Sequence, residues 1–251
     1  MPEFLKNRLT SWRLLLILGL LVVLSHYIVT SQKGAVLERR GKNYDYLLVR
    51  PHNTSDSDPP RPLLIFLHGS GEVHKTLRDL RHLNFVHCVG AMAKSDDFPF
   101  IIVCPKGDGP IWEPDRLIAF LDELLAGNPT VGKIDPARVY LTGFSLGGYG
   151  TWQTAAQYPD RFAAVVPVAG DSNPAWAESF GSLPVWAFHG ENDRTVHPNP
   201  AVETIAAIRE FRRKTEEIRL TLYPEMGHDI EKMAYRNPEL YQWLLQHRSE
   251  K

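Results

Sequence analysis

Short apolar runs alternate with longer amphipathic stretches from residue 36 to the end of the chain. The runs are rich in β-branched residues, and most are followed by a stretch in which apolar residues recur with helical spacing. This alternation is typical of a mostly parallel central sheet with helices on both faces, an α/β fold. The expected strands cover residues 63–67, 100–104, 138–141, 163–168, 185–188 and 219–223. The expected helices cover residues 76–94, 114–126, 146–158, 200–216 and 229–247.

Three local patterns refine this picture. Residues 36–50 are typical of a hairpin that turns at 40–43, and the polar stretch 52–62, with two adjacent prolines, is expected to be a surface loop. Asn237-Pro238 breaks the last helix, because Asn can cap a helix and Pro fits its first turn. Few residues separate successive strands, so we expect one domain over residues 36–251.

The N-terminal segment, residues 1–35, has a different pattern. The uncharged apolar run 14–24 follows Lys6, Arg8 and Arg13, and the stretch 12–29 approaches the length of about 20 residues that spans a bilayer. We expect an N-terminal hydrophobic helix that anchors the protein in a membrane. A signal removed after a site near residues 29–31, which would release a secreted protein, is the alternative. The secretory layout of this segment favours export of the large C-terminal part, to a periplasmic or extracytoplasmic location. Basic residues stand on both sides of the apolar run, so the positive-inside rule does not decide the orientation.

Composition excludes several classes of protein. The chain has 28 Lys and Arg against 29 Asp and Glu, so it offers no broad attraction to nucleic acid, and no nucleic-acid partner is expected. Two cysteines, Cys88 and Cys104, are too few for a disulfide framework or a four-cysteine zinc site. We expect them to be free buried thiols, with a single bridge as the alternative. His74, His82 and His87 lack metal-ligand spacing and are expected on a solvated helix face.

Residues 143–147 read Gly-Phe-Ser-Leu-Gly. An apolar run leads into this motif and a helical pattern leads away from it, which is the strand, sharp turn and helix of a nucleophile elbow. In such a turn the serine backbone is strained, and small residues beside it let the strand and the helix pass closely. Gly143, Gly147 and Gly148 meet that need, so Ser145 is the candidate nucleophile.

A serine hydroxyl needs an imidazole to accept its proton and a carboxylate to orient that imidazole. Asp193 and His228 each follow a later expected strand, in the order that a hydrolase of this kind requires, and are the candidate partners. Asp171 is the second choice for the acid, and Glu191 ranks below it. His68 and His189 close their strands in His-Gly pairs, where a histidine usually hydrogen-bonds to loop backbone.

The reaction also needs two backbone N–H donors for the oxyanion. Leu146 supplies one, because it follows the nucleophile at the start of a helix. The segment His68-Gly-Ser-Gly-Glu follows the strand 63–67, where the second donor is expected. We assign the second donor to Ser70, with Gly69 as the alternative.

Residues 36–251 resemble the α/β-hydrolase superfamily, and within it the compact esterases grouped with phospholipase/carboxylesterases, polyhydroxyalkanoate-depolymerase-like esterases and peptidase-like relatives. The resemblance rests on segments 67–72, 135–148, 158–162, 189–193 and 227–228. It implies a metal-independent serine hydrolase without a cofactor, with Ser145, Asp193 and His228 at the triad positions. After Glu72 the chain lacks the Arg-Gly that often follows in the peptidase-like branch.

The sequence therefore predicts an enzyme that hydrolyses carboxylic esters of small molecules through an acyl-enzyme intermediate. Thioesterase, lysophospholipase and serine peptidase activities use the same residues and remain alternatives, because one sequence does not give the shape of the substrate pocket. A non-catalytic binding module is disfavoured, because every triad position holds a competent residue.

Overall fold

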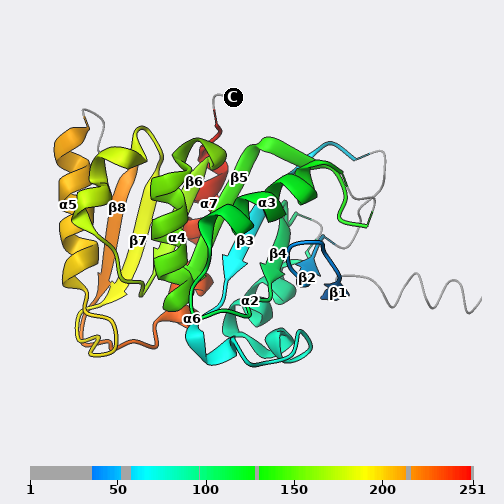
Figure 1. Ribbon diagram of the computed structural model, residues 1–251, viewed down its shortest axis with the longest axis horizontal. Helices are drawn as coiled ribbons and strands as arrows, with labels where there is room; N and C mark the ends of the chain where they lie inside the picture. The colour runs from blue at the N-terminus through cyan, green and yellow to red at the C-terminus, as the bar shows by residue number, and fades with distance from the viewer. Residues whose placement is uncertain (1–35, 52–57, 96, 128–129, 213–215, 250–251) are drawn as a thin grey trace, which may run out of the picture.

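One mostly parallel sheet contains all eight strands that the computed structural model defines among residues 36–51, 58–95, 97–127, 130–212 and 216–249 (Figure 1). The spatial order is β1-β2-β4-β3-β5-β6-β7-β8. Strand β2 pairs antiparallel with both β1 and β4, whereas strands β3 to β8 are parallel to one another. The strands are β1 (Leu37–Arg39), β2 (Tyr46–Val49), β3 (Arg61–Leu67), β4 (Ile101–Pro105), β5 (Ile134–Phe144), β6 (Ala164–Val168), β7 (Val185–Gly190) and β8 (Ile218–Tyr223).

Helices cover both faces of this sheet (Figure 1). On one face lie α3 (Pro114–Leu125), α4 (Leu146–Gln157) and α5 (Asn199–Phe211), and on the other lie α2 (Asn84–Met92), α6 (Glu231–Arg236) and α7 (Pro238–Gln246). Strand β3 shows why there are two cores, because successive side chains point to opposite faces. Leu63 and Ile65 pack with the first set of helices, whereas Leu64 and Phe66 pack with the second.

The fold confirms the expected α/β architecture in its main elements. The hairpin pairs Leu37 with Leu48 and Arg39 with Tyr46. All six expected strands are present within a few residues of their expected ends. The expected break before α7 is also present, since the Asn237 side chain accepts a hydrogen bond from the Glu239 N–H and Pro238 occupies the first turn.

The expected helix over residues 76–94 was too long. A short 3₁₀ turn, Asp79–His82, precedes α2, and Leu83 between them has extended backbone (φ −61°, ψ 142°). The N–H of Phe85, near the start of α2, donates to the Glu231 carboxylate 3.3 Å away. This partner comes from α6, far along the chain, so local spacing could not reveal where α2 begins.

Other boundaries also differ. The expected loop 52–62 is shorter, because β3 begins at Arg61, whose N–H donates to Lys133 O, and Pro62 falls where the register with β5 shifts. A proline fits such an irregular position because it has no N–H to donate. Helix α5 ends at Phe211 rather than continuing to residue 216. The 3₁₀ segment Pro174–Phe180 after β6 was not expected; the Asn173 side chain caps it by accepting from the Ala175 N–H.

The hydrophobic segment 12–29 lies outside the described residues, so the anchor, the signal and the division of the chain near residue 35 remain predictions. Within the described part of the chain, no helix is both long enough and apolar enough to cross a bilayer.

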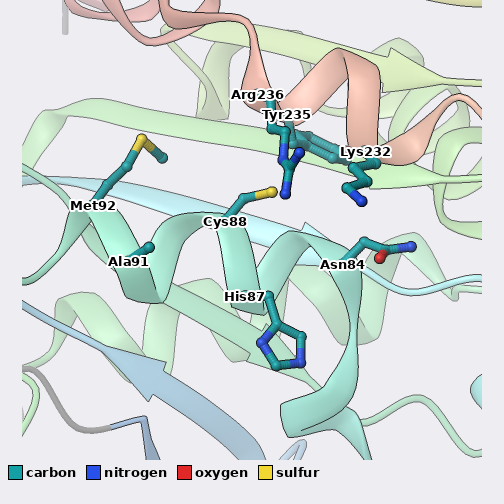
Figure 2. Close-up of a pocket in the computed structure, with 8 residues that line it drawn as sticks. All are labelled: Asn84, His87, Cys88, Ala91, Met92, Lys232, Tyr235 and Arg236. Atoms are coloured by element: carbon teal, nitrogen blue, oxygen red, sulfur yellow. The ribbon is translucent and has the colours of Figure 1, made fainter.

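A groove of about 480 Å³ lies between α2 and α6 (Figure 2). The sulfur of Cys88 extends from α2 toward Tyr235 and Arg236, and the Cys88 side chain is only half-buried. Cys104 is buried in β4, and its burial raises the pKa of its thiol. Both thiols are free, as expected, but only Cys104 is fully buried.

The two thiols should therefore react differently. In the native protein an aromatic disulfide reagent should titrate Cys88 within minutes and leave Cys104 unreacted, because only a thiolate that the reagent can reach attacks it. In denaturant both thiols should titrate. Cys88→Ala is the control and should abolish the native signal; a native signal that survives this change would contradict the assignment.

Candidate active site

Ser145 lies at the turn between β5 and α4 and has an unusual backbone conformation. Its φ is +57° and its ψ is −115°, a region that non-glycine residues rarely adopt. The turn is held by hydrogen bonds on both sides: the Ser145 N–H donates to Val168 O at 2.9 Å, and Ser145 O accepts from the Tyr149 N–H at 3.0 Å. Such strain persists only where surrounding structure imposes it, and it is frequent at reactive residues.

Glycines make this turn possible by allowing contacts between backbones. A Cβ atom on Gly147 would lie 1.9 Å from Leu67 O, and one on Gly148 would lie 2.5 Å from Val168 O. Both distances are far below any real carbon contact. The start of α4 therefore rests directly on the ends of β3 and β6.

The structure brings Ser145, Asp193 and His228 together. His228 Nε2 lies 2.9 Å from Ser145 Oγ, and His228 Nδ1 lies 2.7 Å from Asp193 Oδ2. The three side chains follow β5, β7 and β8, whose carboxyl ends meet at one edge of the parallel sheet. The His228 ring also packs 5.1 Å from the Phe144 ring, centroid to centroid.

Asp193 is fully buried but well supplied with hydrogen bonds. Its Oδ1 accepts from the N–H groups of Thr195 and Val196, and its Oδ2 accepts from His228. Burial alone would raise the pKa of Asp193, but these hydrogen bonds outweigh it and lower the pKa. An ionised carboxylate can only accept, so His228 Nδ1 carries the proton and its Nε2 is free to accept the Ser145 hydroxyl proton.

The competing residues lie elsewhere or have other partners. Asp171 is exposed, and its Oδ1 accepts from the neighbouring Ser172 N–H. Glu191 is also exposed. The buried rings of His68 and His189 bond to loop backbone, as expected: His189 Nε2 donates to Val196 O at 2.9 Å.

His68 holds the loop that faces the nucleophile. Its Nε2 accepts from the Gly107 N–H at 3.0 Å, so the ring proton is on Nδ1, which donates to Gly69 O at 2.8 Å. The Trp112 indole N–H donates to His68 O. The sequence did not reveal this role for Gly107 and Trp112, because it depends on a loop 39 residues away along the chain.

The expected oxyanion donors come from two segments, the loop after β3 and the turn at Ser145. Gly69 is buried against the nucleophile, since a Cβ on Gly69 would lie 3.5 Å from Ser145 Cβ. Ser70 follows it at the exposed start of the 3₁₀ turn Ser70–Glu72, and Leu146 is the first residue of α4. Within the described residues, the N–H groups of Ser70 and Leu146 donate no hydrogen bond to protein atoms. Their assignment as oxyanion donors stays a prediction.

Histidines 74, 82 and 87 are exposed. Among the residues that the structure describes, no group of three or more His, Cys, Asp or Glu side chains is placed to hold a metal ion.

The dienelactone hydrolase family matches residues 114–236, a range that contains Ser145, Asp193 and His228. Over that range the chain resembles the dienelactone hydrolase family, which is part of the α/β-hydrolase superfamily. The chain is 30% identical over 146 residues to "Putative esterase NocK" of Nocardia uniformis subsp. tsuyamanensis, a match that covers 53% of this chain and 40% of the relative. It is 28% identical over 207 residues to "Putative carboxymethylenebutenolidase" of Escherichia coli K12, covering 75% and 73%.

Solved structures share the fold of this chain at low sequence identity. A thermostable esterase aligns with a TM-score of 0.66 at 22% identity, over 85% of this chain and 63% of that chain. A "Putative Dienelactone Hydrolase" of Klebsiella pneumoniae aligns with a TM-score of 0.59 at 17% identity, over 84% of this chain and 99% of that chain.

Two buried histidines, His68 and His189, and the half-buried His247 lead to a prediction about stability. Burial lowers the pKa of His68, His189 and His247 below the ordinary histidine value of about 6.5, although nearby hydrogen bonds or charges oppose it. As pH falls below about 6.5, these histidines bind protons in the unfolded chain more readily than in the folded chain. The contribution of these histidines to the free energy of unfolding should therefore be smaller at pH 5.5 than at pH 7.5, and we expect the protein to be less stable at pH 5.5.

Urea unfolding at the two pH values measures this loss. His247→Gln, remote from the triad, should reduce the loss, whereas His82→Gln changes an exposed histidine and should keep it. Equal or greater stability at pH 5.5 in the wild type would contradict the prediction.

Proposed function

We propose that this chain hydrolyses carboxylic esters of small molecules through a covalent acyl-enzyme. The observation that carries the proposal is the hydrogen-bonded series from Asp193 through His228 to Ser145, with Ser145 in a strained turn at the carboxyl edge of the sheet. Nucleophile, base and orienting acid are in contact and in the protonation states that the first step requires.

In the first step Ser145 Oγ attacks the ester carbonyl carbon while His228 Nε2 takes the hydroxyl proton. The imidazolium that forms is stabilised by the Asp193 carboxylate, which stays ionised. The carbonyl oxygen becomes an oxyanion, and we assign its donors to the N–H groups of Leu146 and Ser70. Two donors that the folded protein already leaves unpaired need no rearrangement when the charge develops.

When the tetrahedral intermediate collapses, the bond to the alcohol oxygen breaks and His228 gives its proton to the leaving alkoxide. The acyl group stays on Ser145. A water molecule then attacks the acyl carbon, His228 takes its proton, and a second collapse returns the proton to Ser145 Oγ and releases the acid.

The similar proteins support an ester substrate, since NocK and the thermostable esterase are both described as esterases. The chain spans 40% of the length of NocK and 22% of an acetylxylan esterase/xylanase of Neocallimastix patriciarum, so their particular substrates are not transferred to it.

The triad assignment predicts graded losses of activity. Ser145→Ala should lower kcat by about four to six orders of magnitude, because no nucleophile remains. Asp193→Asn should cost about 10⁴ in kcat, because the amide favours the wrong imidazole tautomer. The matched control Asp171→Asn changes an exposed carboxylate and should cost less than threefold.

Steady-state rates on 4-nitrophenyl esters of increasing chain length, with thioester and peptide substrates alongside, measure these losses. If Ser145→Ala hydrolyses the esters at a rate within tenfold of the wild type, Ser145 is not the nucleophile. If Asp171→Asn loses more activity than Asp193→Asn, Asp171 is the acid.

We further propose that residues 12–29 anchor the catalytic domain in a membrane, on the exported side. The support is the length and apolar character of this stretch and the basic residues before it.

Attachment is tested by fractionation. The full-length chain should stay in the membrane fraction after carbonate extraction, and a chain lacking residues 1–31 should be soluble and hydrolyse the same esters. A soluble product whose N-terminus is Gln32 would instead show a cleaved signal. Aggregation of the shortened chain would show that the segment belongs to the folded core.

A further inference from the structure

A carboxylate that the proposed reaction does not use lies beside the nucleophile. Glu72 ends the 3₁₀ turn Ser70–Glu72, directly after the loop that faces Ser145. A Cβ atom placed on Gly69 would lie 3.3 Å from Glu72 Oε2 and 3.5 Å from Ser145 Cβ. The carboxylate and the nucleophile therefore flank the same small space above Gly69.

The two oxygens of Glu72 differ. Oε1 accepts from Lys75 Nζ at 3.2 Å. Oε2 accepts no hydrogen bond within the described part of the chain, yet it is not sealed from solvent. The Glu72 side chain is 18% exposed and the Lys75 side chain 48% exposed, so the cation lies on the solvent side of the pair. Lys75 bonds to Oε1 and not to Oε2, the oxygen that would lie 3.3 Å from a Cβ atom on Gly69.

Charges of both signs act near this loop. Burial lowers the pKa of His68; the charge of Glu72 opposes this shift, and the charge of Lys106 adds to it. Burial raises the pKa of Glu231, with Glu72 and Asp229 adding to the rise. Asp193 is hydrogen-bonded to His228, which in turn contacts Ser145.

We infer that Glu72 determines substrate charge: its carboxylate disfavours esters that carry an anionic group near the scissile bond and favours neutral or cationic ones. The inference rests on the proposed ester hydrolysis. A unit charge placed about 7 Å from Glu72 at the rim of a solvated site would change kcat/KM by roughly threefold to sevenfold. A cationic and an anionic ester matched in shape should therefore differ by roughly tenfold or more because of Glu72.

The test is a matched set of 4-nitrophenyl esters whose acyl chains end in a trimethylammonium, a tert-butyl or a carboxylate group. A second set carries the same three groups on the alcohol. The quantity measured is the kcat/KM of the cationic ester divided by that of the anionic ester, at low salt. In Glu72→Gln this ratio should fall by threefold or more in at least one set. A change below threefold in both sets overturns the inference.

Two variants separate charge from structure. Lys75→Gln removes the partner cation and should raise the ratio, the opposite of Glu72→Gln. Glu38 on β1 forms an exposed ion pair with Arg81. Glu38→Gln removes the same charge as Glu72→Gln but should leave the ratio unchanged. If Glu72 only braced the loop, Glu72→Gln would lower kcat for all the esters alike and the ratio would stay constant. That result would overturn the inference.

A second measurement distinguishes failure of the proposed ester hydrolysis from failure of the inference about Glu72. A wild type that hydrolyses none of the esters contradicts ester hydrolysis, and the charge ratio is then taken from the rates at which cationic and anionic aryl phosphonates label Ser145. A ratio that falls in Glu72→Gln would uphold the inference without the activity. A constant ratio, or no labelling by any probe, would overturn it.

Discussion

The contact between the first turn of α4 and the end of β3 is the constraint on which the site depends. Gly147 has no side chain, and only for that reason can its backbone approach Leu67 O so closely. This contact fixes the helix while Ser145 stays at φ +57°, a conformation that costs on the order of 1–3 kcal/mol. A single methyl group at Gly147 would force the helix away from the strand and move Ser145 Oγ out of reach of His228.

The electrostatics of the site follow from the same sheet edge. Asp193 is buried, and an unpaired carboxylate there would be strongly destabilising. Two backbone N–H groups and the His228 ring offset that cost, and they also fix which nitrogen of the imidazole carries the proton. The hydrogen bonds that let the fold tolerate Asp193 therefore prepare the base for Ser145. Among the described residues, the Glu72 side chain accepts a hydrogen bond only from Lys75, so it has no comparable set of donors.

The sequence predicted the parts of the molecule that local patterns control. Buried strands of a parallel sheet are continuous apolar runs, and Gly-x-Ser-x-Gly between a strand and a helix predicted where Ser145 turns. Asp193 and Asp171 both follow a strand between Ser145 and His228, and Asp193 was the first choice; the structure places only Asp193 against His228. Features set by distant contacts were missed. The start of α2 depends on Glu231, and the loop beside the nucleophile depends on a bond from Gly107 to His68.

Ser145, His228 and two prepared N–H groups should act as one reaction centre. A crystal structure of the protein after reaction with an alkyl fluorophosphonate tests this, because the adduct resembles the tetrahedral intermediate. We expect a phosphorus atom bonded to Ser145 Oγ, with one phosphonyl oxygen within about 3 Å of the N–H groups of both Leu146 and Ser70. An unmodified Ser145, or a phosphonyl oxygen that points to solvent and away from both N–H groups, would contradict it.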